Sequence, residues 1–329
     1  MRRWLRRFIG GSADAQRRGA APPQHSGLTH PASAGPSTLP SIGPYAGADS
    51  ALAHDGAVDI PIDDPRPRFV EWLLDLGPSR DGPAGADERR LLARLDALVD
   101  AQADLGQLLP RTPAVIPQLL STLRQDGASV ELLAQRVARD PHLVTEAIRM
   151  ANGAAARGID PVATLPEAIR RIGLAGLQRV IARVLVRPVF DAAPDTLSAR
   201  AAPRLWAHSE LQAERCMALA RAAGVDPFDG YLAGLVHNTG WTVVLRVIDR
   251  AGLALPPALT RECADALELR RERLFAMLAS RWSLSPAIDA LAAERLDERP
   301  AALRGPLAAC LAEADRAAAR QVLAEAGAG

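Results

Sequence analysis

Two histidines in this chain have a setting that could hold a divalent metal ion. His208 lies in Leu205–Ser209 and His237 ends the apolar segment Tyr231–His237, so both are expected on helices. A metal held in this way lowers the pKa of a bound water and polarises a phosphoryl oxygen, which is the chemistry of phosphate-ester hydrolysis. The residue after His237 is Asn238, however, and its neutral carbonyl oxygen is a much poorer metal ligand than a carboxylate. Asn238 therefore weakens the set of metal ligands that the two histidines could begin.

The residues around this pair leave several interpretations open. A later acid is needed to complete the ligand set, and Asp249 is available, although its spacing does not establish the role. His237 and Trp241 share a helix face if the helix continues through Gly240, and His208 lies beside an apolar stripe. Two neutral histidines that are hydrogen-bonded in a helical core explain both positions without a ligand. A low-affinity metal, an anion or a nucleotide-type ligand between them are the alternatives.

Composition favours an all-α fold as the frame for these residues. Apolar residues make up 48% of the chain and aromatic residues only 4%, and Ala and Leu dominate. The net charge of +1 gives no broad basic field, so nucleic acid is not an expected partner. The local basic clusters Arg170–Arg171 and Arg270–Arg273 are typical of a solvated helix face rather than a phosphate-binding patch.

The cysteines indicate the compartment. Cys216, Cys263 and Cys310 are odd in number and widely spaced, which fits neither a disulfide framework nor a zinc site. The sequence contains no apolar run long enough to span a bilayer and no apolar core of a secretory signal near Met1. Together these features predict a cytoplasmic protein.

The N-terminal part of the chain is expected to lie outside the main domain. Residues 1–10 form a short cationic amphipathic segment, which predicts either weak contact with a membrane surface or a frayed terminus. Residues 11–64 are rich in Gly, Pro, Ala and Ser and predict a disordered tether. Residues 65–104 are predicted to form flanking helices that pack on the main domain, one of them capped by Asp87.

Helical periodicity continues through the main domain, residues 105–305. A helix is expected from His142 to Asn152, a second from Leu165 to Ile172 that ends at Gly173, and a largely apolar third from Leu177 to Val186. Residues 306–329 predict a C-terminal Ala-rich helix that packs on the bundle or pairs with another chain.

Several segments, taken in order, resemble the HDOD family of bacterial signalling proteins, a degenerate branch of the HD phosphohydrolase superfamily. The segments are Leu109–Leu120, Asp140–Leu143, Arg149–Asn152, Leu165–Ile169, Ile172–Leu174, Leu205–Ser209, Tyr231–His237 and Arg281–Ser285. The resemblance implies an all-α, HD-like helical bundle preceded by the disordered N-terminal segment. It also implies a role in signal transduction rather than catalysis.

The same resemblance bears on the candidate site. Catalytic HD proteins carry a His-Asp pair where this chain has His237-Asn238, and the HD-GYP branch carries a lysine at the position of Trp241. The resemblance therefore implies no catalytic residue, no cofactor and no bound metal, and makes His208, His237 and Asn238 vestigial positions of the metal site. The expected partners are other signalling proteins. The alternative is a divergent metal-dependent phosphohydrolase, or a non-hydrolysing sensor, for a nucleotide or cyclic dinucleotide.

Overall fold

A computed structural model describes residues 64–101, 105, 108, 134–135, 137–153, 160–297 and 304–327. The predictions for residues 1–10 and, Asp64 apart, for residues 11–64 lie outside these ranges.

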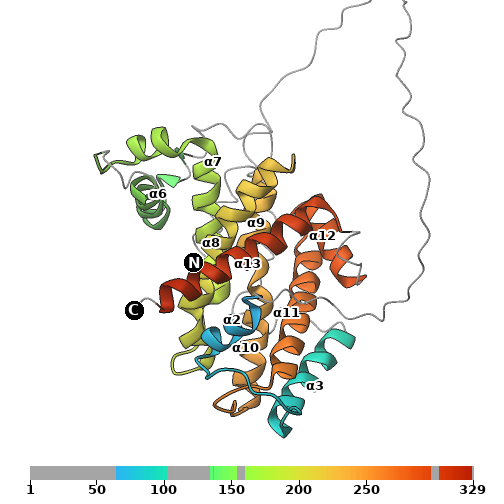
Figure 1. The fold of residues 1–329 in the computed structure, drawn as a ribbon. Helices are drawn as coiled ribbons and strands as arrows, with labels where there is room; N and C mark the ends of the chain where they lie inside the picture. The colour runs from blue at the N-terminus through green and yellow to red at the C-terminus, as the bar shows by residue number, and fades with distance from the viewer. Residues whose placement is uncertain are drawn as a thin grey trace, which may run out of the picture. The chain divides into compact units, whose positions relative to one another are not determined.

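The only β-pairing within the described ranges is one isolated bridge between Arg80 and Thr260. The all-α expectation is confirmed. The elements (Figure 1) are α2 (Arg66–Leu74), α3 (Ala86–Asp100), α6 (Pro141–Gly153), α7 (Leu165–Val186), the 3-10 helix η2 (Arg187–Phe190), α8 (Leu197–Ala222), α9 (Pro227–His237), α10 (Thr239–Ala251), α11 (Arg261–Trp282), α12 (Pro286–Leu296) and α13 (Pro306–Gly327).

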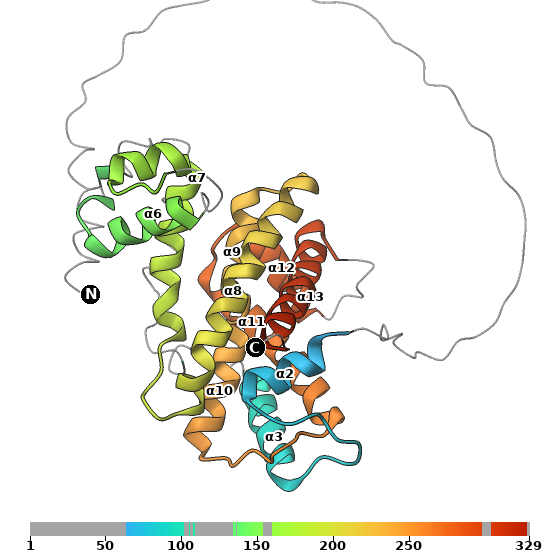
Figure 2. The same ribbon diagram turned by 60° about the vertical axis from the view of Figure 1, so that its left-hand side comes forward.

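Helices α8 and α9 pack closely because α9 carries glycines on the contact face. A Cβ atom at Gly234 would come within 2.7 Å of the backbone of Ala213, and one at Gly230 would meet the backbone of Cys216 at the same distance. Each helix is capped at its start, α8 by the hydroxyl of Thr196 and α9 by the carboxylate of Asp226. The pair lies side by side in Figures 1 and 2 and brings the two histidine-bearing segments together.

His237 and Trp241 were expected to share a helix face if one helix continued through Gly240. The structure does not meet this condition, because the helix is broken at Asn238. Helix α9 ends at His237 and α10 begins at Thr239, with Asn238 between them at φ −72° and ψ 1°. The break follows from packing, because Gly240 lies so close to α11 that a Cβ atom would be 2.1 Å from the carbonyl oxygen of Arg271. The turn at Asn238 therefore brings the start of α10 against the α11 backbone.

We expect Gly240→Ala to lower the free energy of unfolding by about 3 kcal/mol, because the added methyl group must push two helix backbones apart. Gly153→Ala is the matched control, since it also lies in a helix but has no atom within 4 Å of the added Cβ. Its effect should stay within about 0.5 kcal/mol. Urea unfolding followed by circular dichroism measures both variants, and equal losses in the two would contradict the close-packing argument.

The flanking helices α2 and α3 pack on the bundle. Helix α2 buries Phe69, Val70, Leu73 and Leu74 and contacts α8, α11 and α13, while α3 contacts α10 and α11. The expectation that Asp87 caps α3 is wrong. The cap is Gly85, and Glu88 bonds to the backbone N–H of Gly85 and also accepts from the N–H of Thr260 at 2.6 Å. Glu88 thereby ties the start of α3 to the start of α11.

Helices α6 and α7 form a pair at one end of the bundle (Figure 2). Asn152 near the end of α6 exchanges two hydrogen bonds with the backbone of Val162, at 2.8 and 3.0 Å, and so ties the end of α6 to the residues just before α7. The predicted interruption at Gly173 is confirmed, because this residue has φ 63° within α7, in the left-handed region that favours glycine. None of the helices in the described ranges is long and apolar enough to cross a membrane.

Candidate functional site

A set of polar side chains, all of them buried except the partly buried Glu272, lies where α8, α9, α11 and α13 meet. Both histidines of this set are only 1% exposed, so solvent reaches neither of them. We call the set the polar cluster. Its members are His208, Ser209 and Gln212 of α8, His237 and Asn238 at the end of α9, Glu268, Arg271 and Glu272 of α11, and Asp315 of α13.

His208 is a neutral side chain within this cluster. The amide Nδ2 of Asn238 donates to Nδ1 of His208 at 2.8 Å and to the hydroxyl of Ser209 at 2.9 Å. The proton of the ring therefore lies on Nε2, which is 3.4 Å from the carbonyl oxygen of Asp315. Burial lowers the pKa of His208 to about 4. The ring also packs against Phe69 of α2, with ring centroids 4.4 Å apart.

His237 is held between two helices by partners on both ring nitrogens. Gln212 directs its Nε2 to Nδ1 of His237 at 2.7 Å, and Nε2 of His237 lies 2.9 Å from the carboxylate of Glu272. Burial acts to lower the pKa of His237, but the carboxylates of Glu272 and Asp315 together outweigh it and raise that pKa above its usual value. The amide donor at Nδ1 opposes a proton on that atom, so the tautomer with its proton on Nε2 pairs one donor with one acceptor in the contacts with Gln212 and Glu272.

Arg271 is the cation at the centre of the cluster. Its Nη2 donates to Asp315 at 2.7 Å and lies 3.2 Å from Glu272, and its Nε donates to Glu268 at 2.7 Å. Its Nη1 lies 3.0 and 3.1 Å from the two ring nitrogens of His237. The expectation that Arg270–Arg273 lie on a solvated face is wrong for Arg271, which is 2% exposed because the carboxylates compensate its charge inside the core.

The three carboxylates of the cluster differ in their pKa values. Burial acts to raise the pKa of Asp315, but Arg271 and the two histidines together outweigh it and hold that pKa well below its usual range. Burial likewise opposes ionisation of Glu272, whose pKa is nevertheless lowered by His237 and Arg271; Arg295 of α12 also contacts it at 3.1 Å. Burial raises the pKa of Glu268 to about 7. Asp315 and Glu272 are thus the two firmly anionic members, matched by two arginines.

The candidates named from the sequence are only partly brought together. His208, His237 and Asn238 lie in one cluster, whereas Asp249 lies outside it and binds the start of α8 through the N–H groups of Leu197 and Ser198. Trp241 is fully buried as part of the core.

Six members of the cluster were not anticipated as site residues from the sequence: Ser209, Gln212, Glu268, Arg271, Glu272 and Asp315. A weak signal exists for one of them. Asp315 is a lone acid beside Leu311, Ala314 and Ala318, the apolar positions of an Ala-rich helix, and an acid on a buried face needs a partner.

The cluster does not fit a metal ion as it stands. His237, Glu272 and Asp315 each offer one ligand atom, and these atoms lie within 4.8 Å of one another. The guanidinium of Arg271 lies among them, in contact with all three. A metal requires ligand distances of about 2.0–2.2 Å from such atoms, so an ion and the guanidinium cannot share this space.

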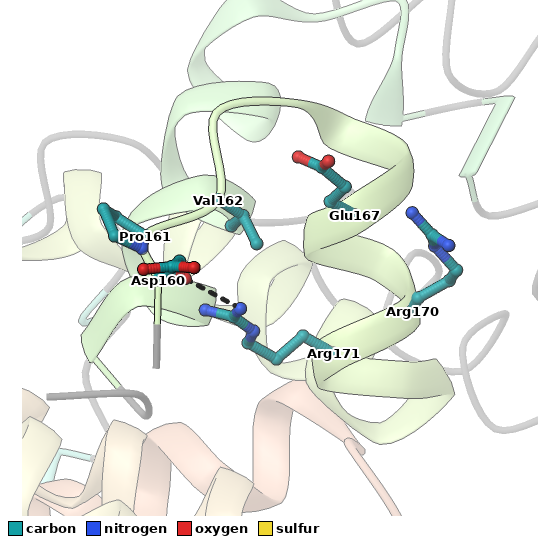
Figure 3. Close-up of a pocket in the computed structure, with 6 residues that line it drawn as sticks. All are labelled: Asp160, Pro161, Val162, Glu167, Arg170 and Arg171. Carbon is teal, nitrogen blue, oxygen red and sulfur yellow. Dashed lines mark hydrogen bonds between the residues drawn. The ribbon is translucent and has the colours of Figure 1, made fainter. Parts of the chain in front are cut away.

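A separate surface pocket of about 420 Å³ lies at the start of α7. Figure 3 shows its lining residues, in which Arg171 donates to the carbonyl oxygen of Asp160 at 2.9 Å. The lining holds two arginines and two acids, so its charges are balanced and it favours neither an anion nor a cation. None of its residues belongs to the polar cluster. The lining residues are Asp160, Pro161, Val162, Glu167, Arg170 and Arg171.

Comparison with solved structures supports the fold. A crystal structure from Shewanella amazonensis, of a protein provisionally named a metal-dependent phosphohydrolase, matches with a TM-score of 0.52 and 19% identity, over 71% of this chain and 83% of that one. The HD-like helical fold is thereby confirmed. An HDOD domain protein of unknown function from Geobacter sulfurreducens matches with a TM-score of 0.47 and 19% identity, over 69% of this chain and 77% of that one.

Sequence comparison supplies the family. An uncharacterised protein of Treponema pallidum is 23% identical over 201 residues, which is 57% of this chain but only 38% of that relative. The chain thus spans well under half the length of that curated relative. The family model described as HDOD domain matches residues 109–296, which is more than half of the chain and agrees with the resemblance identified in the sequence. The chain belongs to the HDOD domain family.

Proposed function

We propose that this chain is a non-catalytic regulatory protein of signal transduction that acts by binding other signalling proteins. The observation that carries the proposal is the use of Asn238 as a hydrogen-bond donor to His208. In a hydrolase the corresponding carboxylate would face a metal, whereas this amide presents N–H groups to the histidine and to Ser209. We therefore interpret His208, His237 and Asn238 as vestigial metal positions that now stabilise the core.

The elements that close the cluster support this proposal. Phe69 of α2 covers His208, and Asp315 of α13 contacts Gln212 and Arg271. Both helices lie outside residues 109–296, so segments flanking the family domain seal its former site. A phosphate ester could reach the histidines only if one of these helices moved away. The outer helix surfaces are then the regions left for contact with partners.

The proposal includes a cytoplasmic location, no cofactor and no nucleic-acid partner. The three cysteines support the location, since all are free and buried, as is usual for thiols in a reducing compartment. The charge balance of 39 basic against 38 acidic residues supports the exclusion of nucleic acid. The partner expected by this reasoning is a protein.

A divergent metal-dependent phosphohydrolase is the second candidate. One observation favours it, namely the convergence of His237, Glu272 and Asp315, whose ligand atoms lie within 4.8 Å of one another. This function would require Arg271 to leave the cluster before a metal could enter.

Assays of phosphate-ester hydrolysis and of partner binding distinguish the two candidate functions. Purified protein is incubated with phosphate monoesters, diesters and cyclic dinucleotides in the presence of Mn²⁺, Ni²⁺ or Zn²⁺, and its tagged form is used to capture proteins from cell extract. We expect wild type to hydrolyse these substrates no faster than His208→Ala does. We also expect wild type and His208→Gln to capture the same partner protein. Hydrolysis that disappears in His208→Ala, with the free energy of unfolding unchanged, would favour the enzyme.

A further inference from the structure

We propose that the guanidinium of Arg271 occupies the position that a metal ion would take in this cluster. When the guanidinium is removed by substitution, His237, Glu272 and Asp315 become able to bind a metal ion. The proposal does not rest on the identity of any protein partner. It explains how a cluster of acids persists in the core of a chain whose His-Asp pair has become His237-Asn238.

The contacts of Arg271 are those of a central ion rather than of a pairwise salt bridge. Its terminal nitrogens reach an imidazole of α9, a carboxylate of α11 and a carboxylate of α13, all within 3.2 Å. These are the three side chains whose ligand atoms converge. A single cation therefore joins three helices, which is the structural task that a metal performs in a closed metal site.

The two firmly anionic carboxylates of the cluster are already matched by cations without a metal. Asp315 and Glu272 are in direct contact with Arg271 and Arg295, and Arg271 also contacts the carboxyl group of Glu268. A divalent ion added to this arrangement would leave uncompensated charge in the core, which is strongly unfavourable. Removal of Arg271 leaves a net negative, buried set of ligands and a space the size of a side chain.

The ligand set left behind suits a particular class of ion. One imidazole and two carboxylates are typical protein ligands of Zn²⁺, Mn²⁺ and Ni²⁺, and water can complete the coordination. His237 and Glu272 lie 2.9 Å apart and now bond to each other directly, so they would have to separate slightly to share an ion. Helix α11 carries both Glu272 and Arg271, and the substitution does not displace the backbone that positions Glu272.

The test is the metal content of Arg271→Ala, measured by elemental analysis after purification without chelator and by calorimetry with Mn²⁺, Ni²⁺ and Zn²⁺ alone. We expect wild type to carry metal only at background level and Arg271→Ala to bind about one ion per chain. The same ion should raise the Tm of Arg271→Ala by several degrees and leave that of wild type unchanged. Binding should be lost again in the double variant Arg271→Ala/Asp315→Ala.

Two further variants guard against trivial outcomes. Arg270→Ala is the matched control, because its guanidinium pairs with Asp96 at 2.6 Å outside the cluster, and it should bind no metal. Arg271→Lys keeps the positive charge and should remain folded and metal-free. The proposal is overturned if wild type binds metal as tightly as Arg271→Ala. It is equally overturned if folded Arg271→Ala binds no metal, or if Arg271→Lys does bind it. It is also overturned if Arg271→Ala fails to fold both with and without metal.

Discussion

Replacing Asp315 with alanine is expected to lower the free energy of unfolding by about 3–5 kcal/mol, the usual cost of removing one partner from a buried ion pair. The carboxylate accepts from Arg271 at 2.7 Å and from Gln212 at 3.1 Å, and it lies within 3.8 Å of both histidines. Its loss leaves the charge of Arg271 with fewer anions around it in a region closed to water. Urea unfolding measures the difference.

Glu313→Ala is the control for this prediction. Glu313 lies on the same helix, but its pair with Arg316 is about half exposed, so its loss should cost less than about 1 kcal/mol. A double variant, Asp315→Leu/Arg271→Met, should recover a large part of the loss, since it removes both buried charges and fills the space with apolar atoms. A loss in Asp315→Ala no larger than that of Glu313→Ala would show that the pair does not stabilise the fold.

The position of Arg271 could not be predicted from the sequence. Local pattern identifies a residue by its neighbours along the chain, and Arg270, Arg271 and Arg273 have similar neighbours. What distinguishes Arg271 is its helical phase: it shares a face with Glu268 and points to His237 and Asp315, which come from α9 and α13. Such a partnership depends on how distant helices pack, and an isolated helix carries no information about it.

The histidines and Asn238, by contrast, could be predicted to belong together. Each lies within an ordered set of short segments, and the apolar run before His237 requires a buried helix. The same is true of the interruption at Gly173, because a glycine at the end of an apolar stripe commonly takes a left-handed conformation. Asp249 illustrates the limit, since an acid near the right spacing proved to hold the start of α8. Proximity in sequence predicts local structure, whereas membership of the cluster depends on long-range packing.

The contribution of His208 to the stability of the fold should fall as the pH is lowered from about 6.5 to about 4. Burial lowers the pKa of His208 in the folded state to about 4, whereas the ordinary value is 6.5. Over this range the unfolded chain takes up a proton that the folded core excludes, so unfolding becomes more favourable as the pH falls. Below about pH 4 the contribution of His208 is constant. Its size is at most about 3 kcal/mol, at about 1.36 kcal/mol per pKa unit.

The slope of the free energy of unfolding between pH 6.5 and 4 is therefore the informative measurement. His208→Gln keeps an acceptor and a donor for Asn238 and Asp315 but cannot be protonated. As the pH is lowered over this range, wild type should therefore lose free energy of unfolding relative to His208→Gln. His142→Gln, at an exposed position of α6, is the control and should leave the slope unchanged. If His208→Gln were to keep the wild-type slope, the histidine would have to gain its proton in the folded state. Asn238 could then no longer donate to it, and the interpretation of this pair as a closed structural contact would be wrong.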